Sequence, residues 1–270
     1  MKKLAVVFVI VSILSACALA GPLERGTAKL WKNGTFHQET VEINKDGTIH
    51  AKVDGKWQDF KPVELPKEFL EWNFGARTEM IEGIKTGNMP SSMAGPHNAA
   101  VASYGILRKD SKMKINNAVK GTGFVPKPEK IKEVIKHLKE TLESPMPEKL
   151  DVLLGYYAAG ADVFDITKQV SLELYSTPEF EGGTFVNQME NPGCSLVYLD
   201  IPSYELKCVA HLLHPTDPQL NDYEKDVVEY INLIHSYFHG AFDETFIAVI
   251  YNVIEVYDNS PASRGVRVTP

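Results

Sequence analysis

Hydrophobic positions repeat along this chain with two different periods, and each period predicts one kind of element. Apolar residues recur at helical spacing over 66–85, 126–142 and 223–238, with charged residues on the opposite face. Pro66 suits the first position of a helix, where a backbone N–H would have no intrahelical partner. A shorter helix is predicted at 183–190.

Shorter runs of alternating or continuous apolar residues predict β-strands. Two of these runs form a hairpin around a polar turn at 108–111. The run nearest the carboxyl end is long enough for a central strand. The predicted strands are 98–107, 112–119, 150–157, 162–166, 170–175, 194–199, 206–213 and 246–256.

The stretch before the first helix has the pattern of a small β-meander. Asn33-Gly34, Asp46-Gly47 and Asp54-Gly55 favour the tight turns of β-hairpins, and they predict about four strands up to Pro62. We interpret its aromatic residues as a packing face, with a ligand platform as the alternative. These residues are Trp31, Phe36, Trp57 and Phe60.

The first twenty residues have the pattern of a secretory signal. Lys2 and Lys3 precede an apolar run at 4–14, which is shorter than the roughly 20 residues of a membrane span. The next residues, Leu-Ser-Ala-Cys17, resemble a bacterial lipobox, in which Cys17 becomes lipidated. A competing cleavage site ends at Ala20, and either cleavage predicts an exported, periplasmic chain.

The elements together predict an α+β fold built on a largely antiparallel sheet or barrel. We expect a signal peptide at 1–20, the β-meander at 21–62 and a second domain at 63–270.

Charge narrows the range of functions. The chain has 28 Lys and Arg against 35 Asp and Glu, a net charge of −7, without a block of basic residues. This balance argues against nucleic-acid binding. The sequence also has no P-loop, no dinucleotide fingerprint and no Gly-x-Ser-x-Gly motif, so ATP, NAD and serine-hydrolase chemistry are poor candidates.

The second half has a characteristic order of elements. A strand ends in Leu-Glu-Leu-Tyr-Ser-Thr177, a polar turn leads into the helix at 183–190, and Asn191-Pro192 precedes an apolar strand. Over 98–262 this order resembles the FMN-binding split-barrel family of pyridoxamine 5′-phosphate oxidase. The resemblance implies an antiparallel split β-barrel with peripheral helices, a bound FMN, oxidoreductase activity and a homodimer. It also implies that the helix near 126–145 is an insertion into this domain.

The resemblance also implies which residues hold the flavin phosphate. The turn at 179–184 is acidic, whereas family members that bind FMN tightly carry cations there, so Lys120 is the candidate for the missing charge. The alternative is that these are ordinary turn and cap residues. The remaining candidates are Ser176, Thr177, Thr184 and Asn187.

Two histidines support a second hypothesis. His235 and His239 lie four residues apart on a predicted helix, as a pair of metal ligands requires, and His211 and His214 are near in sequence. They predict, as an alternative function, a non-catalytic periplasmic binding or scaffold lipoprotein that holds haem or a divalent metal.

Cys194 and Cys208 are the thiols outside the signal segment. Their spacing is not Cys-x-x-Cys, which argues against a redox dithiol. Two interpretations remain: the cysteines form a cross-strand disulfide, or both are small residues of the core.

Overall fold

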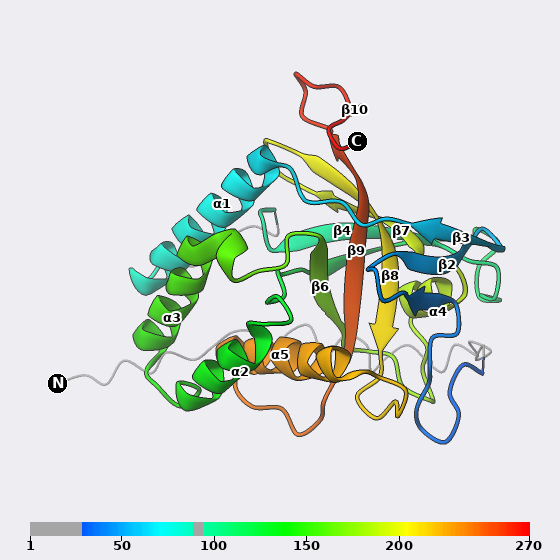
Figure 1. Ribbon diagram of the computed structural model, residues 1–270, viewed down its shortest axis with the longest axis horizontal. Helices are drawn as coiled ribbons and strands as arrows, with labels where there is room; N and C mark the ends of the chain where they lie inside the picture. Colours follow the sequence, from blue (N-terminus) through cyan, green and yellow to red (C-terminus); the bar gives the residue numbers. More distant parts are fainter. Residues whose placement is uncertain (1–28, 89–93) are drawn as a thin grey trace.

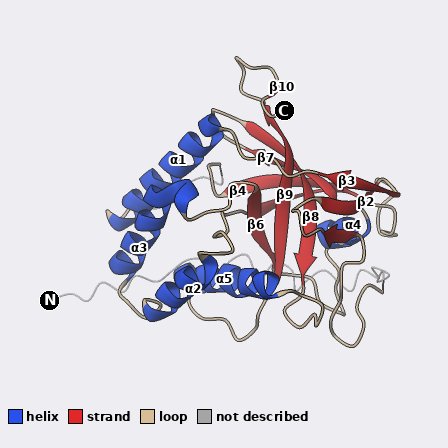
Figure 2. Cartoon of the chain, in the orientation of Figure 1, coloured by secondary structure: helices blue, strands red, loops and turns tan. Residues whose placement is uncertain are grey.

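A curled antiparallel sheet forms the centre of the molecule, with helices packed around it (Figures 1 and 2). The computed structural model describes residues 29–88 and 94–270. The predicted signal peptide at 1–20, including Cys17, lies outside the described residues. Within the described ranges, no helix is long and apolar enough to cross a membrane.

Groups of strands and helices follow one another along the chain. The helices are α1 (Lys67–Lys85), α2 (Ile131–Glu140), α3 (Met146–Ala159), α4 (Gly183–Glu190) and α5 (Asp222–His239). The strands are β1 (Val41–Ile43), β2 (Ile49–Val53), β3 (Lys56–Phe60), β4 (Asn98–Tyr104), β5 (Ile115–Gly121), β6 (Lys168–Glu173), β7 (Gly193–Tyr198), β8 (Tyr204–Leu213), β9 (Ile247–Asp258) and β10 (Val266–Arg267).

The large sheet is a split barrel. Its strands follow the order β10-β9-β8-β7-β4-β5, and β6 also pairs with β9. Just after β5, the backbone of Gly123 exchanges two hydrogen bonds of 2.8 Å with Val170 of β6. This contact joins the two ends of the sheet at one point and leaves the rest of the β5–β6 seam without strand pairing. The predicted α+β split barrel with a preceding β-meander is therefore confirmed.

Three layers cover the barrel. At one end, the α1 residue Phe69 packs edge-on against Tyr198 and Tyr204, with ring centroids 5.5 and 5.2 Å apart. The β1–β3 meander lies against β8, where its apolar face contacts Val209. Helices α2 and α5 cover the third side, and α3 lies beside α1 (Figure 2). The cluster between these helices and the sheet includes Leu138, Leu150, Val227, Ile231, Val170, Leu213 and Ile250.

Two predicted strands are wrong. Residues 150–157 belong to α3, and the segment 162–166 follows a short 3-10 turn at Gly160–Asp162. The run at 150–157 is apolar at most positions, so its period does not distinguish a strand from a helix. Pro147 within the first turn and the length of the segment favour the helix. The segment between β5 and β6 thus contains two helices, α2 and α3.

The meander also differs from the prediction. It has three strands, because residues 29–40 run as an arm along the barrel and do not form a fourth. Phe36 on this arm is buried in the main core, where Trp31 also packs. Trp57 is 42% exposed and stacks on His50, so it is not part of a core.

Candidate functional site

The amino-terminal end of α4 is an open helix terminus. Gly182 precedes the helix in an extended conformation, and no side chain caps the first turn. Among the described residues, no group accepts a hydrogen bond from the backbone N–H of Gly183, Thr184 or Phe185. Free N–H groups and the helix dipole make such a terminus favourable for an anion, and for a phosphate above all.

A guanidinium group lies against this terminus. Arg108, from the β4–β5 loop, donates a 2.9 Å hydrogen bond from Nη1 to Oδ1 of Asn116. Its Nε and Nη2 donate to the two carboxylate oxygens of Asp110, and these bonds raise the pKa of Arg108. A Cβ atom at Gly183 would lie 2.5 Å from Nη1 of Arg108. Glycine at this position therefore allows the cation to reach the helix.

Two of the predicted phosphate residues line the same terminus. The Thr184 hydroxyl accepts a 2.7 Å hydrogen bond from Asn116, so it is linked to Arg108 through one side chain. The Ser176 hydroxyl accepts a 3.0 Å hydrogen bond from the backbone N–H of Gly182. It donates in turn to the buried carboxylate of Glu173.

The other two predicted residues have different roles. The Thr177 hydroxyl accepts hydrogen bonds from the backbone N–H groups two and three residues later, and so closes an exposed turn. Asn187 is fully buried, and its Nδ2 donates to the Ser103 hydroxyl and to the Lys114 carbonyl. Its Oδ1 has no partner in the described chain. Neither side chain lines the helix terminus.

The structure changes the interpretation of the charges near the site. Lys120 is close to Ser176, but its Nζ lies 2.6 Å from Oε2 of Glu173, which already balances its charge. One carboxylate of the acidic turn, that of Glu181, is buried and accepts a hydrogen bond from the backbone N–H of Leu30. It therefore does not face the helix terminus. The cation at the terminus is Arg108, which the sequence pattern predicts only as the first residue of a turn.

His235 and His239 form a neighbouring pair on α5. Their ring centroids are 4.8 Å apart, and burial lowers the pKa of both imidazoles. In the two described ranges, no group of three His, Cys, Asp or Glu side chains is arranged to hold a metal. Protein metal sites with two ligands are weak, because structural and catalytic zinc sites use at least three.

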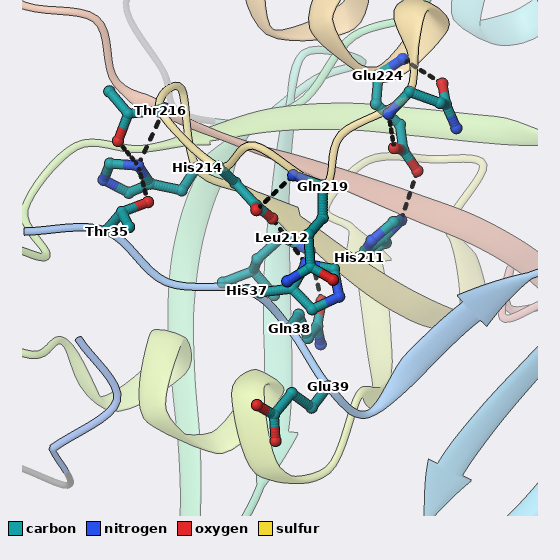
Figure 3. Close-up of polar contacts among 12 residues, drawn as sticks. Thr35, His37, Gln38, Glu39, His211, Leu212, His214, Thr216, Gln219 and Glu224 are labelled. Atoms are coloured by element: carbon teal, nitrogen blue, oxygen red, sulfur yellow. Dashed lines mark hydrogen bonds and ion pairs between the residues drawn. The ribbon is translucent and has the colours of Figure 1, made fainter. Parts of the chain in front are cut away.

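A second polar cluster holds the arm at 29–40 against the barrel (Figure 3). The buried amide of Gln38 accepts a 2.6 Å hydrogen bond from the N–H of Leu212. Its Nε2 donates to the carbonyls of Gln188 and Ala210. One side chain of the arm thereby satisfies backbone groups of both α4 and β8, which fixes the position of the arm.

Histidines surround this contact, which no local pattern in the sequence predicts. Nδ1 of His37 lies 2.7 Å from Oδ2 of the buried Asp217, and His214 contacts the hydroxyl of Thr35 at 3.0 Å (Figure 3). Burial lowers the pKa of His211 to about 4, so its ring is neutral at pH 7. These residues come from segments about 180 positions apart, which left no local signal in the sequence.

Comparisons with known proteins add little to this description. No protein-family model matches the sequence, and no curated protein matches it. Seven chains of solved structures match. One is a tagged form of HupZ from Group A Streptococcus, with 12% identity, a TM-score of 0.33, and coverage of 70% of this chain and 96% of that chain.

Proposed function

We propose that this protein binds flavin mononucleotide, with the phosphate at the amino-terminal end of α4. The supporting observation is the guanidinium of Arg108 at Gly183. Helix termini of this polarity favour acidic groups. Asp110 balances the charge of Arg108, but the guanidinium keeps N–H donors that Asp110 and Asn116 do not use. Together with the free backbone N–H groups, these donors favour an anionic ligand beside them.

The groups present fit a phosphate. The backbone of Gly183 and Thr184 offers N–H donors, the Thr184 hydroxyl accepts from Asn116 and keeps its proton as a further donor, and Arg108 offers a charge-assisted donor. The Ser176 hydroxyl donates to Glu173 and adds no donor. Close by in sequence, Tyr175 and Phe180 are exposed and provide aromatic surface for a flat ring. A bound flavin would supply redox chemistry, while the chain would bind and orient it.

A titration that compares FMN with riboflavin tests the proposal. FMN fluorescence should be quenched at stoichiometric protein, and riboflavin, which lacks the phosphate, should bind much more weakly. Arg108→Gln should weaken FMN binding at least about tenfold, because hydrogen bonds to charged groups contribute roughly 1.5–3 kcal/mol. Lys109→Gln, at the adjacent exposed cation, should leave FMN binding unchanged.

Equal affinity for FMN and riboflavin would show that the phosphate does not bind at the amino-terminal end of α4, because the phosphate would then contribute nothing to the affinity. If neither ligand binds, the non-catalytic binding or scaffold protein becomes the better hypothesis. In that case, a titration with haemin and then Zn²⁺, with His235→Asn as the variant, tests the pair on α5.

We also propose the homodimer that the family resemblance implies. Register pairs Ala100 with Val119 and Tyr104 with Ile115, so these side chains share the outer face of β4 and β5. Ile115 and Val119 are exposed there. Light scattering during size-exclusion chromatography should give twice the chain mass, and Val119→Lys should halve it. Ile43→Lys, at an exposed apolar position of the meander, should not.

Export and lipid anchoring complete the proposal, and the pattern at residues 1–20 supports them. Cell fractionation should find the chain in the membrane fraction, and Cys17→Ser should release it. The intact mass should include a lipid on Cys17. A mature chain that begins at Gly21 would instead show cleavage at the competing site.

A further inference from the structure

The β4–β5 loop exposes a group of apolar side chains. We call residues 105–114 the hairpin tip, which extends past the ends of the two strands (Figure 1). Ile106 is 64% exposed, Leu107 40% and Met113 68%. Exposed large apolar residues that gather in one loop indicate a contact surface.

The fold holds the hairpin tip in this exposed arrangement. Oε2 of Glu190, at the end of α4, accepts hydrogen bonds from the backbone N–H groups of Ile106 and Leu107 at 2.7 and 2.8 Å. Gly105 packs so closely on Asn187 that a Cβ atom there would lie 2.9 Å from that residue. The Lys114 ammonium donates to the carbonyls of Arg108 and Ser111. These contacts fix the backbone while the apolar side chains point to solvent.

The hairpin tip is basic, although the whole chain carries a net charge of −7. It contains four basic residues and one acidic residue, Asp110, which pairs with Arg108. Lys109 and Lys112 are exposed, and no acidic side chain among the described residues pairs with either. The tip therefore combines apolar side chains with free cations.

We propose that the hairpin tip docks on the surface of a bilayer that contains anionic phospholipid. Its apolar side chains enter the interface while Lys109 and Lys112 contact lipid phosphates. The side chains project from a loop at the end of a hairpin and do not line a groove, which suits a bilayer better than a shaped protein partner. The proposal does not require flavin binding at α4, although Arg108 of the same loop lies at that helix terminus.

Fluorescence of a probe on the tip tests the proposal in the full chain. Met113→Cys, in a Cys17→Ser background, carries the environment-sensitive dye NBD, and Lys45→Cys carries it as a control on an exposed turn of the meander. Vesicles with about 30% phosphatidylglycerol in phosphatidylcholine should brighten the probe at 113 and shift its emission to the blue. Pure phosphatidylcholine vesicles should have little effect, and the probe at 45 should not respond.

Lys109→Gln combined with Lys112→Gln should weaken this response about 30-fold, since each basic group near an anionic surface contributes roughly 1 kcal/mol. Circular dichroism should confirm that the double variant folds. A silent probe at 113 on a chain that still sediments with vesicles overturns the proposal, because another segment then makes the contact. An equal response to both vesicle types overturns the role of the cations. A blue shift that grows with protein concentration in the absence of vesicles would overturn the proposal, because the hairpin tip would then contact a second copy of the chain.

Discussion

Nζ of Lys120 on β5 lies 2.6 Å from Oε2 of Glu173 on β6, and both side chains are largely buried. The pair bridges the seam of the barrel, three residues before Gly123 makes the backbone contact that closes it. Glu173 also accepts a hydrogen bond from Ser176, so the seam and the helix terminus of α4 share one charged group.

Removal of one partner of this ion pair should destabilise the barrel. Lys120→Met leaves the Glu173 carboxylate buried without its cation, and we expect the free energy of unfolding to fall by about 3 kcal/mol. Adding Glu173→Gln should recover part of the loss, because no buried charge then remains. Urea unfolding followed by circular dichroism measures both. Lys56→Met, at an exposed position of β3, is the control, and an equal loss in that variant would contradict a specific role for the pair.

Gly183→Ala should separate ligand binding from stability. The added Cβ would meet Nη1 of Arg108 and Oδ1 of Asn116 at 2.5 and 2.7 Å, so the guanidinium must leave the terminus. We expect FMN affinity to fall at least about tenfold, in line with the loss of one charge-assisted contact.

The matched control is Gly155→Ala within α3, where no atom lies within 4 Å of the added Cβ. It should keep its FMN affinity and gain about 0.5–1 kcal/mol of stability, since alanine suits a helix interior better. Unchanged FMN affinity in Gly183→Ala would show that FMN does not bind next to Arg108.

The buried His211 should make the protein sensitive to acid. Its pKa of about 4 in the folded chain is below the value of about 6.5 in an unfolded chain. The unfolded state therefore binds more protons between these two values, and stability is fully present above pH 6.5 and lost as the pH falls toward 4. Between pH 7 and pH 5, His211 should account for a loss of about 2 kcal/mol.

Urea unfolding at both pH values tests this expectation with His211→Gln, which should lose less stability on acidification than the wild-type chain. His97, whose pKa burial also lowers to about 4, should retain its own share of the pH dependence. An identical pH dependence in the variant and the wild type would show that His211 is not the buried titrating group.

The two cysteines should be unreactive in the folded protein. Cys194 and Cys208 lie opposite each other on β7 and β8, and both are free thiols. Burial raises the pKa of Cys194 to about 12 and also raises that of Cys208, so almost no thiolate exists at pH 8. With Cys17→Ser, Ellman's reagent should label neither thiol in native protein and both in denaturant. Rapid labelling of one thiol in the native state would revive the redox hypothesis.

Local pattern predicted much of the fold. The helix at 183–190, the hairpin of β4 and β5 and the strands of β7 and β8 follow from periodicity and turn residues, which act over a few positions. The prediction of a strand at 150–157 was wrong because a run that is apolar at most positions shows neither the period of a strand nor that of a helix. The prediction of a fourth meander strand was wrong because Gln38 forms its hydrogen bonds with the barrel and Phe36 packs in the barrel core, so neither contacts a neighbouring meander strand.

The candidate site, like the fold, was predicted only in part from the sequence. By itself, the sequence determined the acidic balance, most of the order of elements and the residues that begin α4, and it predicts a secretory leader. Only the tertiary structure decided that Arg108 reaches Gly183, that Lys120 is balanced by Glu173, and that His37 meets Asp217. Secondary structure depends on neighbours three or four positions away, whereas these contacts join segments separated by 53 to 180 residues and exist only once the barrel has closed.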